Sequence, residues 1–305
     1  MGFNGLKPST SAPVKSEVAE VLPVIRPMPS PPLTQKPLTA LRFAILDTET
    51  TGPDPHKDEV IEVAVRGWYL NRRRRAPFVY ESYVNPNCLI PPSAIAVHHI
   101  TNDKVAQASQ LEEAMEPVLA LVQDSIPVAY NAEYDRCMLR ETPLHDRYWL
   151  DIYRLAMKTW SIGEKNADGF ALTSFKQQEL RYWLGLRNIE GDAHRAAADI
   201  HVTGLVFQVA VDRYLEKGMA DDADEFLTWL ESPILHKTLP FGPFAGKTPE
   251  QLEDYEIRRA FDKTKPIYES LVRFNVLDYL EPEKMRRALS DNPTLTRRSV
   301  LGHRS

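Results

Sequence analysis

F-A-I-L-D-T-E-T-T-G, from Phe43 to Gly52, is the stretch that decides the fold and the chemistry of this chain. Its first residues, Phe43 to Leu46, are apolar and predict a short buried strand. Asp47 and Glu49 are two positions apart, so in an extended chain both side chains leave the same face. An apolar strand that ends in two carboxylates is costly unless a cation lies between them. The stretch therefore predicts a cation site at the exit of a buried strand.

Two further motifs carry acidic residues and a histidine. Asp135 closes A-Y-N-A-E-Y-D, near the first turn of a predicted helix, and His194 and Asp199 frame H-R-A-A-A-D. Five residues turn a helix by about 500°, so His194 and Asp199 converge only if His194 lies at the helix entry and Asp199 one turn inside. Singly, these residues are typical of turns, helix N-termini and surfaces. Their joint occurrence in this order is what indicates a catalytic site.

The order and contexts of the five residues resemble those of the DEDDh family of 3′–5′ exonucleases, which includes exonuclease X and the epsilon subunit of DNA polymerase III. The residues that carry the resemblance are Asp47, Glu49, Asp135, His194 and Asp199. It extends from about Phe43 to Ala210 and implies an α/β fold, a ribonuclease H-like mixed sheet flanked by helices. The family usually has H-N-A-x-F-D, where Tyr130 and Tyr134 here replace the His and the Phe.

The resemblance also implies a chemistry, the metal-dependent 3′–5′ hydrolysis of nucleic acid to nucleoside 5′-monophosphates. The implied cofactors are two divalent ions, Mg²⁺ or Mn²⁺, and the implied ligands are Asp47, Glu49, Asp135 and Asp199. In the family pattern Asp47 bridges both ions, Glu49 and Asp199 hold the ion with the nucleophilic water, and Asp135 supports the second ion. His194 is the implied general base, because a histidine titrates near working pH.

Four residues resemble the substrate contacts of the family: Thr50, Thr51, His98 and Asn131. Thr50 and Thr51 correspond to residues that hold the terminal 3′-hydroxyl and sugar. His98, in A-V-H-H-I-T, resembles a residue that packs near the terminal nucleotide, and an ordinary loop histidine is the alternative. Asn131 is expected to cap the following helix and to help position the site.

The chain divides into five predicted regions. They are a disordered Pro-rich tail (1–40), an exonuclease domain (41–216), a linker with a short helix (217–236), a small α+β C-terminal module (237–290) and a flexible tail (291–305). The Pro-rich tail holds eight of the 24 prolines. Its alternative interpretation is a docking peptide for a partner. The module is predicted from L-P-F-G-P-F-A-G-K-T (Leu239 to Thr248), which resembles the C-terminal module of exonuclease X-like proteins, although a basic residue normally stands at the position of Pro243.

Hydrophobic periodicity predicts the elements of the exonuclease domain. Strands are predicted at 43–46, 60–70, 78–84 and 126–130, and helices at 111–122, 134–140, 152–159, 174–184 and 193–214. Arg72 to Arg75 form a predicted hairpin tip. They either steer a phosphate backbone or prevent edge pairing of the strands.

Composition limits the partners of the chain. The net charge of −5 and the pI near 5.9 argue against a surface that binds nucleic acid in bulk, but leave room for a local site. Two cysteines, Cys88 and Cys137, fit a reducing cytoplasm. No apolar run predicts a membrane span or a signal peptide.

The expected partner is nucleic acid, with DNA favoured and RNA open. An RNA-trimming exonuclease and a polymerase proofreading subunit are the alternative enzymes, although no polymerase-binding tail is recognisable. A binding module on a degenerate nuclease fold is the non-enzymatic alternative. It predicts the loss of a carboxylate, and none is lost.

Overall fold

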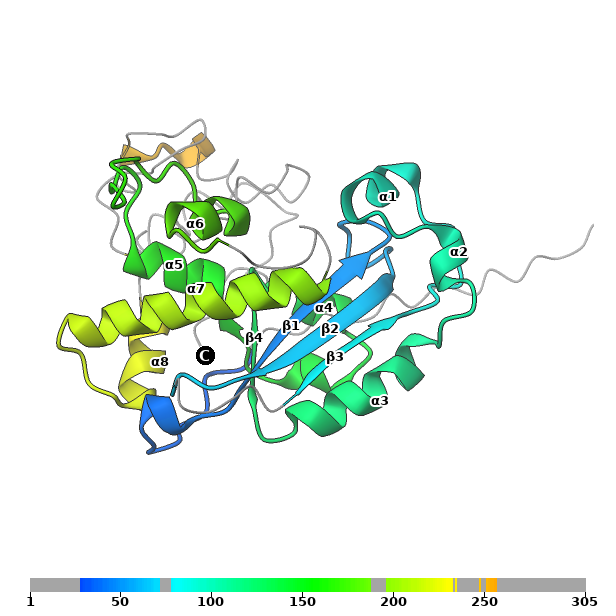
Figure 1. The fold of residues 1–305 in the computed structure, drawn as a ribbon, viewed down its shortest axis with the longest axis horizontal. Helices are drawn as coiled ribbons and strands as arrows, with labels where there is room; N and C mark the ends of the chain where they lie inside the picture. Colours follow the sequence, from blue (N-terminus) through cyan, green and yellow to red (C-terminus); the bar gives the residue numbers. More distant parts are fainter. Residues whose placement is uncertain are drawn as a thin grey trace, which may run out of the picture.

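The computed structural model describes residues 28–71, 78–187, 196–232, 234, 247 and 251–256. Within them, five strands form one mixed sheet in the order β3-β2-β1-β4-β5 (Figure 1). The strands are β1 Phe43–Thr50, β2 Val60–Trp68, β3 Val79–Tyr83, β4 Ile126–Ala129 and β5 Leu150–Asp151. β1 pairs antiparallel with β2 and parallel with β4, so the central strand joins an antiparallel half to a parallel half.

Helices cover both faces of this sheet, and α7 crosses one face while α3 lies on the other (Figure 1). The α-helices are α1 Pro92–His98, α2 Asn102–Val105, α3 Leu111–Val122, α4 Ala132–Met138, α5 Ile152–Thr159, α6 Gln177–Trp183, α7 Ala196–Glu216 and α8 Ala223–Glu231. Two 3-10 helices, η1 Leu38–Ala40 and η2 Pro143–Asp146, complete the set in the described residues. The predicted α/β architecture, a mixed sheet flanked by helices, is confirmed.

Alternation along β1 divides the core into two layers. Phe43 and Ile45 belong to the cluster that includes residues of α5, α7 and α8, whereas Ala44 and Leu46 belong to the cluster with residues of α3 and α4. Because side chains alternate along a strand, Asp47 and Glu49 continue the face of Phe43 and Ile45, which is the face covered by α7. This register determines which helix can bring a further ligand to them.

The structure adds elements that the sequence pattern did not predict. β1 continues to Thr50, so both carboxylates lie within the strand and not after it. The two residues of β5 are too few to give a periodic signal, and the short helices α1 and α2 were not predicted.

Residues 28–40 depart from the predicted disordered tail. Leu38 is fully buried in the core. The backbone N–H of Thr34 donates to Asp224 Oδ1 at 2.7 Å, and the Thr39 hydroxyl donates to Asp221 Oδ2 at 2.6 Å. The acidic start of α8 therefore satisfies polar groups of this segment, while its apolar residue fills the core.

The predicted linker region also packs on the domain. Phe226 and Leu230 of α8 are buried in the core. The guanidinium of Arg154 donates to the carbonyl oxygens of Leu230, Glu231 and Ser232 at 2.8 to 3.0 Å. It thereby caps the C-terminus of α8 and fixes that helix to α5.

Several predicted features lie outside the described residues: Arg72 to Arg75, residues 1–27 and most of the region after residue 234.

Gly204 lets α7 approach the sheet closely. A Cβ atom at this position would lie 2.4 Å from Cζ3 of Trp68 on β2. Nearby, the rings of Phe43 and Phe207 meet edge to face with centroids 4.9 Å apart. The small residue and the aromatic contact set the distance between α7 and the sheet at the start of β1, and the first turn of the same helix carries Asp199.

We expect Gly204→Ala to lower the free energy of unfolding by about 1–3 kcal/mol, because the added methyl group overpacks against the Trp68 ring. Chemical denaturation would measure the loss. The pair Gly204→Ala with Trp68→Leu should show favourable coupling, since the smaller side chain makes room for the methyl group. Strictly additive losses would contradict this explanation.

Candidate active site

Asp47 and Glu49 lie near the end of β1, on the face that α7 covers. Across the antiparallel pair, Asp47 is opposite Ala64 and Glu49 is opposite Glu62. Both side chains are half-buried. The strand register therefore brings three carboxylates, two from β1 and one from β2, to one end of one sheet face.

Asp199 reaches the same point from the first turn of α7. One carboxylate oxygen from each of Asp47, Glu49 and Asp199 can be chosen such that all three lie within 4.8 Å of one another. Asp199 itself is buried, with 6% of its surface exposed. Residues 150 positions apart in the chain thus converge on a space of the size that one hard cation and its ligands occupy.

Acidic neighbours dominate the electrostatics of Asp47 within the part of the chain that the structure describes. Burial raises the pKa of Asp47 well above its usual value, and the carboxylates of Asp135, Glu49, Asp199 and Glu62 raise it further. The charged groups with the largest effects on this pKa are all acidic. Clustered carboxylate oxygens are the donor set that divalent hard metals prefer, so these residues fit such an ion.

Asp135 lies beside this trio on α4 and is almost fully buried. Its Oδ1 accepts hydrogen bonds from the backbone N–H and the hydroxyl of Thr48, at 2.9 and 2.8 Å. Burial raises the pKa of Asp135 to about 7, although the two bonds from Thr48 oppose the shift. The residue is thus tied to β1 between the two carboxylates of the strand, and its charge acts on Asp47.

Asp151, at the end of β5, joins the helices around Asp135 and was not predicted as part of the site. Its Oδ1 accepts from the N–H of Tyr153 at 2.8 Å and from the N–H of Asn131 at 3.1 Å, so one carboxylate covers the N-termini of α5 and α4. Burial raises its pKa to about 6, against these backbone bonds. An Asp directly before a helical pattern is the sequence signal that indicates such a cap.

Glu62 is a second residue that sequence reasoning missed. It is 2% exposed within the apolar strand β2, and its Oε2 accepts from the N–H of Ala196, the first described residue of α7, at 3.2 Å. The signal was present, because a lone carboxylate in V-I-E-V-A-V has no reason to be buried without a partner. Glu62 links β2 to the helix that carries Asp199.

Thr50 and Thr51, predicted to contact substrate, are buried and have partners within the protein. The hydroxyl of Thr50 is 2.6 Å from the hydroxyl of Tyr134 and also donates to the carbonyl of Gly52 at 2.8 Å. The hydroxyl of Thr51 donates to Asp58 at 3.1 Å. In this structure both residues fix the loop that follows β1, and substrate contact stays a prediction.

His98 ends α1 and is 2% exposed, so it is not an ordinary surface histidine. Its Nδ1 accepts from the N–H of Ile100 at 3.0 Å, which assigns the proton of the neutral ring to Nε2. Burial lowers its pKa, and the carboxylate of Glu62 partly offsets that effect. Its predicted contact with the terminal nucleotide is not tested by this geometry.

The expectation that the Asn131 side chain caps α4 is wrong. Asn131 occupies the N-cap position with φ 65° and ψ 55°, and its side chain makes no capping bond. Asparagine tolerates this left-handed conformation, and the Asp151 carboxylate instead accepts backbone N–H groups of Asn131 and Ala132 at the start of α4. His194, the predicted general base, lies outside the described residues.

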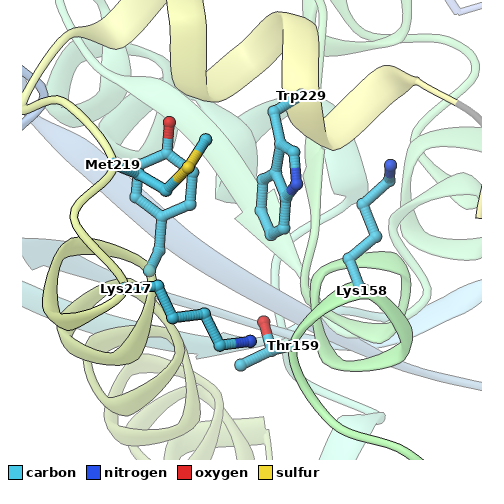
Figure 2. Close-up of a pocket in the computed structure, with 6 residues that line it drawn as sticks. Lys158, Thr159, Lys217, Met219 and Trp229 are labelled. Carbon is cyan, nitrogen blue, oxygen red and sulfur yellow. The ribbon is translucent and has the colours of Figure 1, made fainter.

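A cavity of about 130 Å³ lies elsewhere, between α5, α7 and α8. Figure 2 shows Lys158, Lys217, Met219 and Trp229 around it. Tyr214 also lines the cavity, 15 residues after Asp199 on α7 and hence about 22 Å along the helix axis. The two lysines lie at the C-terminal ends of α5 and α7, where cations stabilise the helix dipole. This cavity is not part of the acidic cluster.

Residues 44–207, more than half of the chain, match the profile of the family described as Exonuclease, or RNase_T. The chain therefore belongs to this exonuclease family. The match begins on β1 and ends on α7, the two elements that bring Asp47, Glu49 and Asp199 together. The resemblance predicted from the five sequence positions is confirmed at the level of the family.

Among curated relatives, a DNA polymerase III subunit epsilon-like protein of Rhodobacter capsulatus is 33% identical over 182 residues, 57% of this chain and 24% of that protein. The 3′-5′ exonuclease DinG of Bacillus subtilis is 25% identical over 239 residues, 70% of this chain and 24% of that protein. The chain thus spans about a quarter of the length of these two relatives.

Among solved structures, exonuclease X in complex with 5′ overhanging duplex DNA is 22% identical, with a TM-score of 0.46, and the similarity covers 62% of this chain and 99% of that one.

Among the helices that the structure describes, none combines the length and apolar character that crossing a bilayer requires.

Addition of Mn²⁺ should stabilise the wild-type protein, because the ion binds the folded cluster and neutralises its charge. At a concentration 100 times Kd the gain is about 2.7 kcal/mol. Thermal unfolding with and without the ion would measure it. Asp47→Asn, which keeps the size of the side chain, should remove the gain. Equal stabilisation of this variant would show that the ion binds elsewhere.

Without divalent metal, the free energy of unfolding should fall as the pH rises from about 4 to above 7. Asp135 has a pKa of about 7 when folded and about 3.9 when unfolded. Its contribution is therefore fully present below pH 4 and is lost as the pH rises through 7, by at most about 1.4 kcal/mol per pH unit. Urea denaturation in a chelating buffer would measure the slope. Asp135→Asn, which keeps an oxygen acceptor for Thr48, should flatten it, and an unchanged slope would contradict the assignment.

Proposed function

We propose that this protein is a metal-dependent 3′–5′ exonuclease that hydrolyses the phosphodiester bonds of DNA. The observation that carries the proposal is the convergence of Asp47, Glu49 and Asp199, from β1 and α7, within 4.8 Å. These are residues of the motifs by which the chain resembles 3′–5′ exonucleases, and all three lie within the matched segment. The names of the epsilon-like and DinG relatives support the same reaction and DNA as substrate.

The proposed cofactors are two divalent ions, Mg²⁺ or Mn²⁺. Asp47, Glu49 and Asp199 would hold them, and Asp135 would add charge from the side of α4. Bound ions would stabilise the charge that develops on the phosphate and would lower the pKa of the attacking water. The concentration of acidic groups around Asp47 supports this assignment.

Other side chains of the protein would activate the water, contact the substrate and support the acidic residues. His194 would take the proton from the attacking water, as the resemblance to the DEDDh exonucleases implies. Thr50 and Thr51 would meet the terminal sugar, with Tyr134 fixing Thr50 through the hydroxyl contact at 2.6 Å. Glu62 would hold the start of α7, so that Asp199 keeps its distance from β1. The expected products are nucleoside 5′-monophosphates from a 3′ end.

The test is degradation of a 5′-labelled single-stranded DNA oligomer with Mg²⁺ or Mn²⁺. We expect a ladder that shortens from the 3′ end and requires the metal. Asp47→Ala and His194→Ala should each lower the rate by about 100-fold or more, because one removes a ligand and the other the base. Arg187→Ala, which removes an exposed ion pair with Asp168, is the control and should leave the rate unchanged.

An RNA oligomer of the same sequence, assayed alongside, distinguishes the substrate classes by rate. Faster hydrolysis of RNA would replace DNA by RNA in the proposal. Failure of a folded, metal-binding protein to cleave either oligomer would overturn the proposal of an enzyme that acts alone. Activity that appears only with a co-purified polymerase would favour the proofreading alternative.

A further inference from the structure

Two adjacent glutamines on α6 contact Asp199 on α7. The side-chain amide of Gln177 donates to the backbone carbonyl of Asp199 at 2.8 Å and to the Thr203 hydroxyl at 2.9 Å. The side-chain amide of Gln178 donates to the carboxylate Oδ1 of the same Asp199 at 2.9 Å. Consecutive helical side chains diverge by about 100°, so the pair divides its bonds between the backbone and the carboxylate of one residue.

The two glutamines constrain different parts of Asp199. The bonds of Gln177 go to a backbone oxygen and to a hydroxyl one turn further on, so they join α6 to α7 whatever the side chain of residue 199 is. The bond of Gln178 goes only to the carboxylate. This bond therefore restricts the rotation of the Asp199 side chain and holds Oδ1 in a fixed direction.

Gln178 is itself connected to a buried cation. Its Oε1 accepts from Nη1 of Arg181 at 3.3 Å, one turn along α6, and Arg181 is 8% exposed. Hydrogen bonds in series polarise one another, so a cation on the amide oxygen strengthens the amide N–H as a donor. Arg181 thus strengthens the hydrogen bond that Gln178 donates to the Asp199 carboxylate.

We propose that Gln178 is a positioning residue for Asp199, and that the affinity of the acidic cluster for divalent metal depends on its amide. This inference rests on the proposed function, because it takes Asp199 as a metal ligand. Groups that hydrogen-bond a ligand orient it and lower the entropy lost when the ion binds. Nothing in the five-residue motif includes Gln178. Its role follows from the packing of α6 on the first turn of α7.

The test is calorimetric titration of Mn²⁺ into Gln178→Met and Gln177→Met, two neighbouring variants that replace an amide by an apolar side chain of similar length. Gln178→Met should weaken binding by about 10- to 100-fold. Gln177→Met should keep the affinity within about threefold, although its unfolding midpoint falls, since it removes helix packing alone. Circular dichroism verifies the fold of both, and Gln178→Leu repeats the test if the Met variant does not fold.

A second measurement separates positioning from structural damage. The rate of DNA degradation by Gln178→Met should recover towards the wild-type rate when Mn²⁺ is raised about 100-fold, because the defect lies in the occupancy of the site. A rate that stays low at saturating metal would indicate a distorted site and overturn the proposal. So would equal metal affinity of the Gln178→Met and wild-type proteins.

The outcomes also separate the two proposals. If the wild-type protein binds no Mn²⁺, the metal-dependent function fails and the inference fails with it. If the wild-type protein binds Mn²⁺ and loses it in Asp47→Asn, but both glutamine variants bind normally, only the role of Gln178 is rejected.

Discussion

The structure depends on one costly arrangement, the crowding of carboxylates around Asp47. Burial and four neighbouring acidic groups all oppose its ionisation. Folding must therefore hold like charges together by packing that is strong elsewhere. The mixed sheet, the close approach of α7 at Gly204 and the edge-to-face contact of Phe43 with Phe207 provide that packing. The clustered carboxylate oxygens are what make the site suited to a divalent cation.

Acidic residues around the site fall into two groups according to the bonds that they accept. Glu62 and Asp151 accept backbone N–H groups at the start of α7, α5 and α4, and so they compensate for helix ends that would otherwise be unsatisfied. Asp47, Glu49 and Asp199 each place a carboxylate oxygen within 4.8 Å of the other two. The capping carboxylates hold the helices in place, and the helices in turn hold the clustered carboxylates.

Sequence reasoning succeeded where the signal was local. The helices at 111–122 and 152–159 were predicted with the bounds that the structure gives, because their apolar residues repeat with helical spacing. It failed where a residue acts through a distant partner. Asn131 was expected to cap α4, but the carboxylate that does so lies 20 residues later, and residues 28–40 pack through acidic groups of α8. Short elements such as β5 carry too few residues for any period to be visible.

The sequence by itself determined the family and the acidic residues that could bind a cation. Asp47 and Glu49 two apart in an extended strand must share a face, and the order of Asp135 and Asp199 after them identified the family. Only the tertiary structure decided which residues support them. Glu62, Asp151 and Gln178 gain their roles from strand register and helix packing, which join positions far apart in the chain. A hydrogen bond of 2.9 Å between α6 and Asp199 has no local pattern, because its geometry exists only once both helices lie on the sheet.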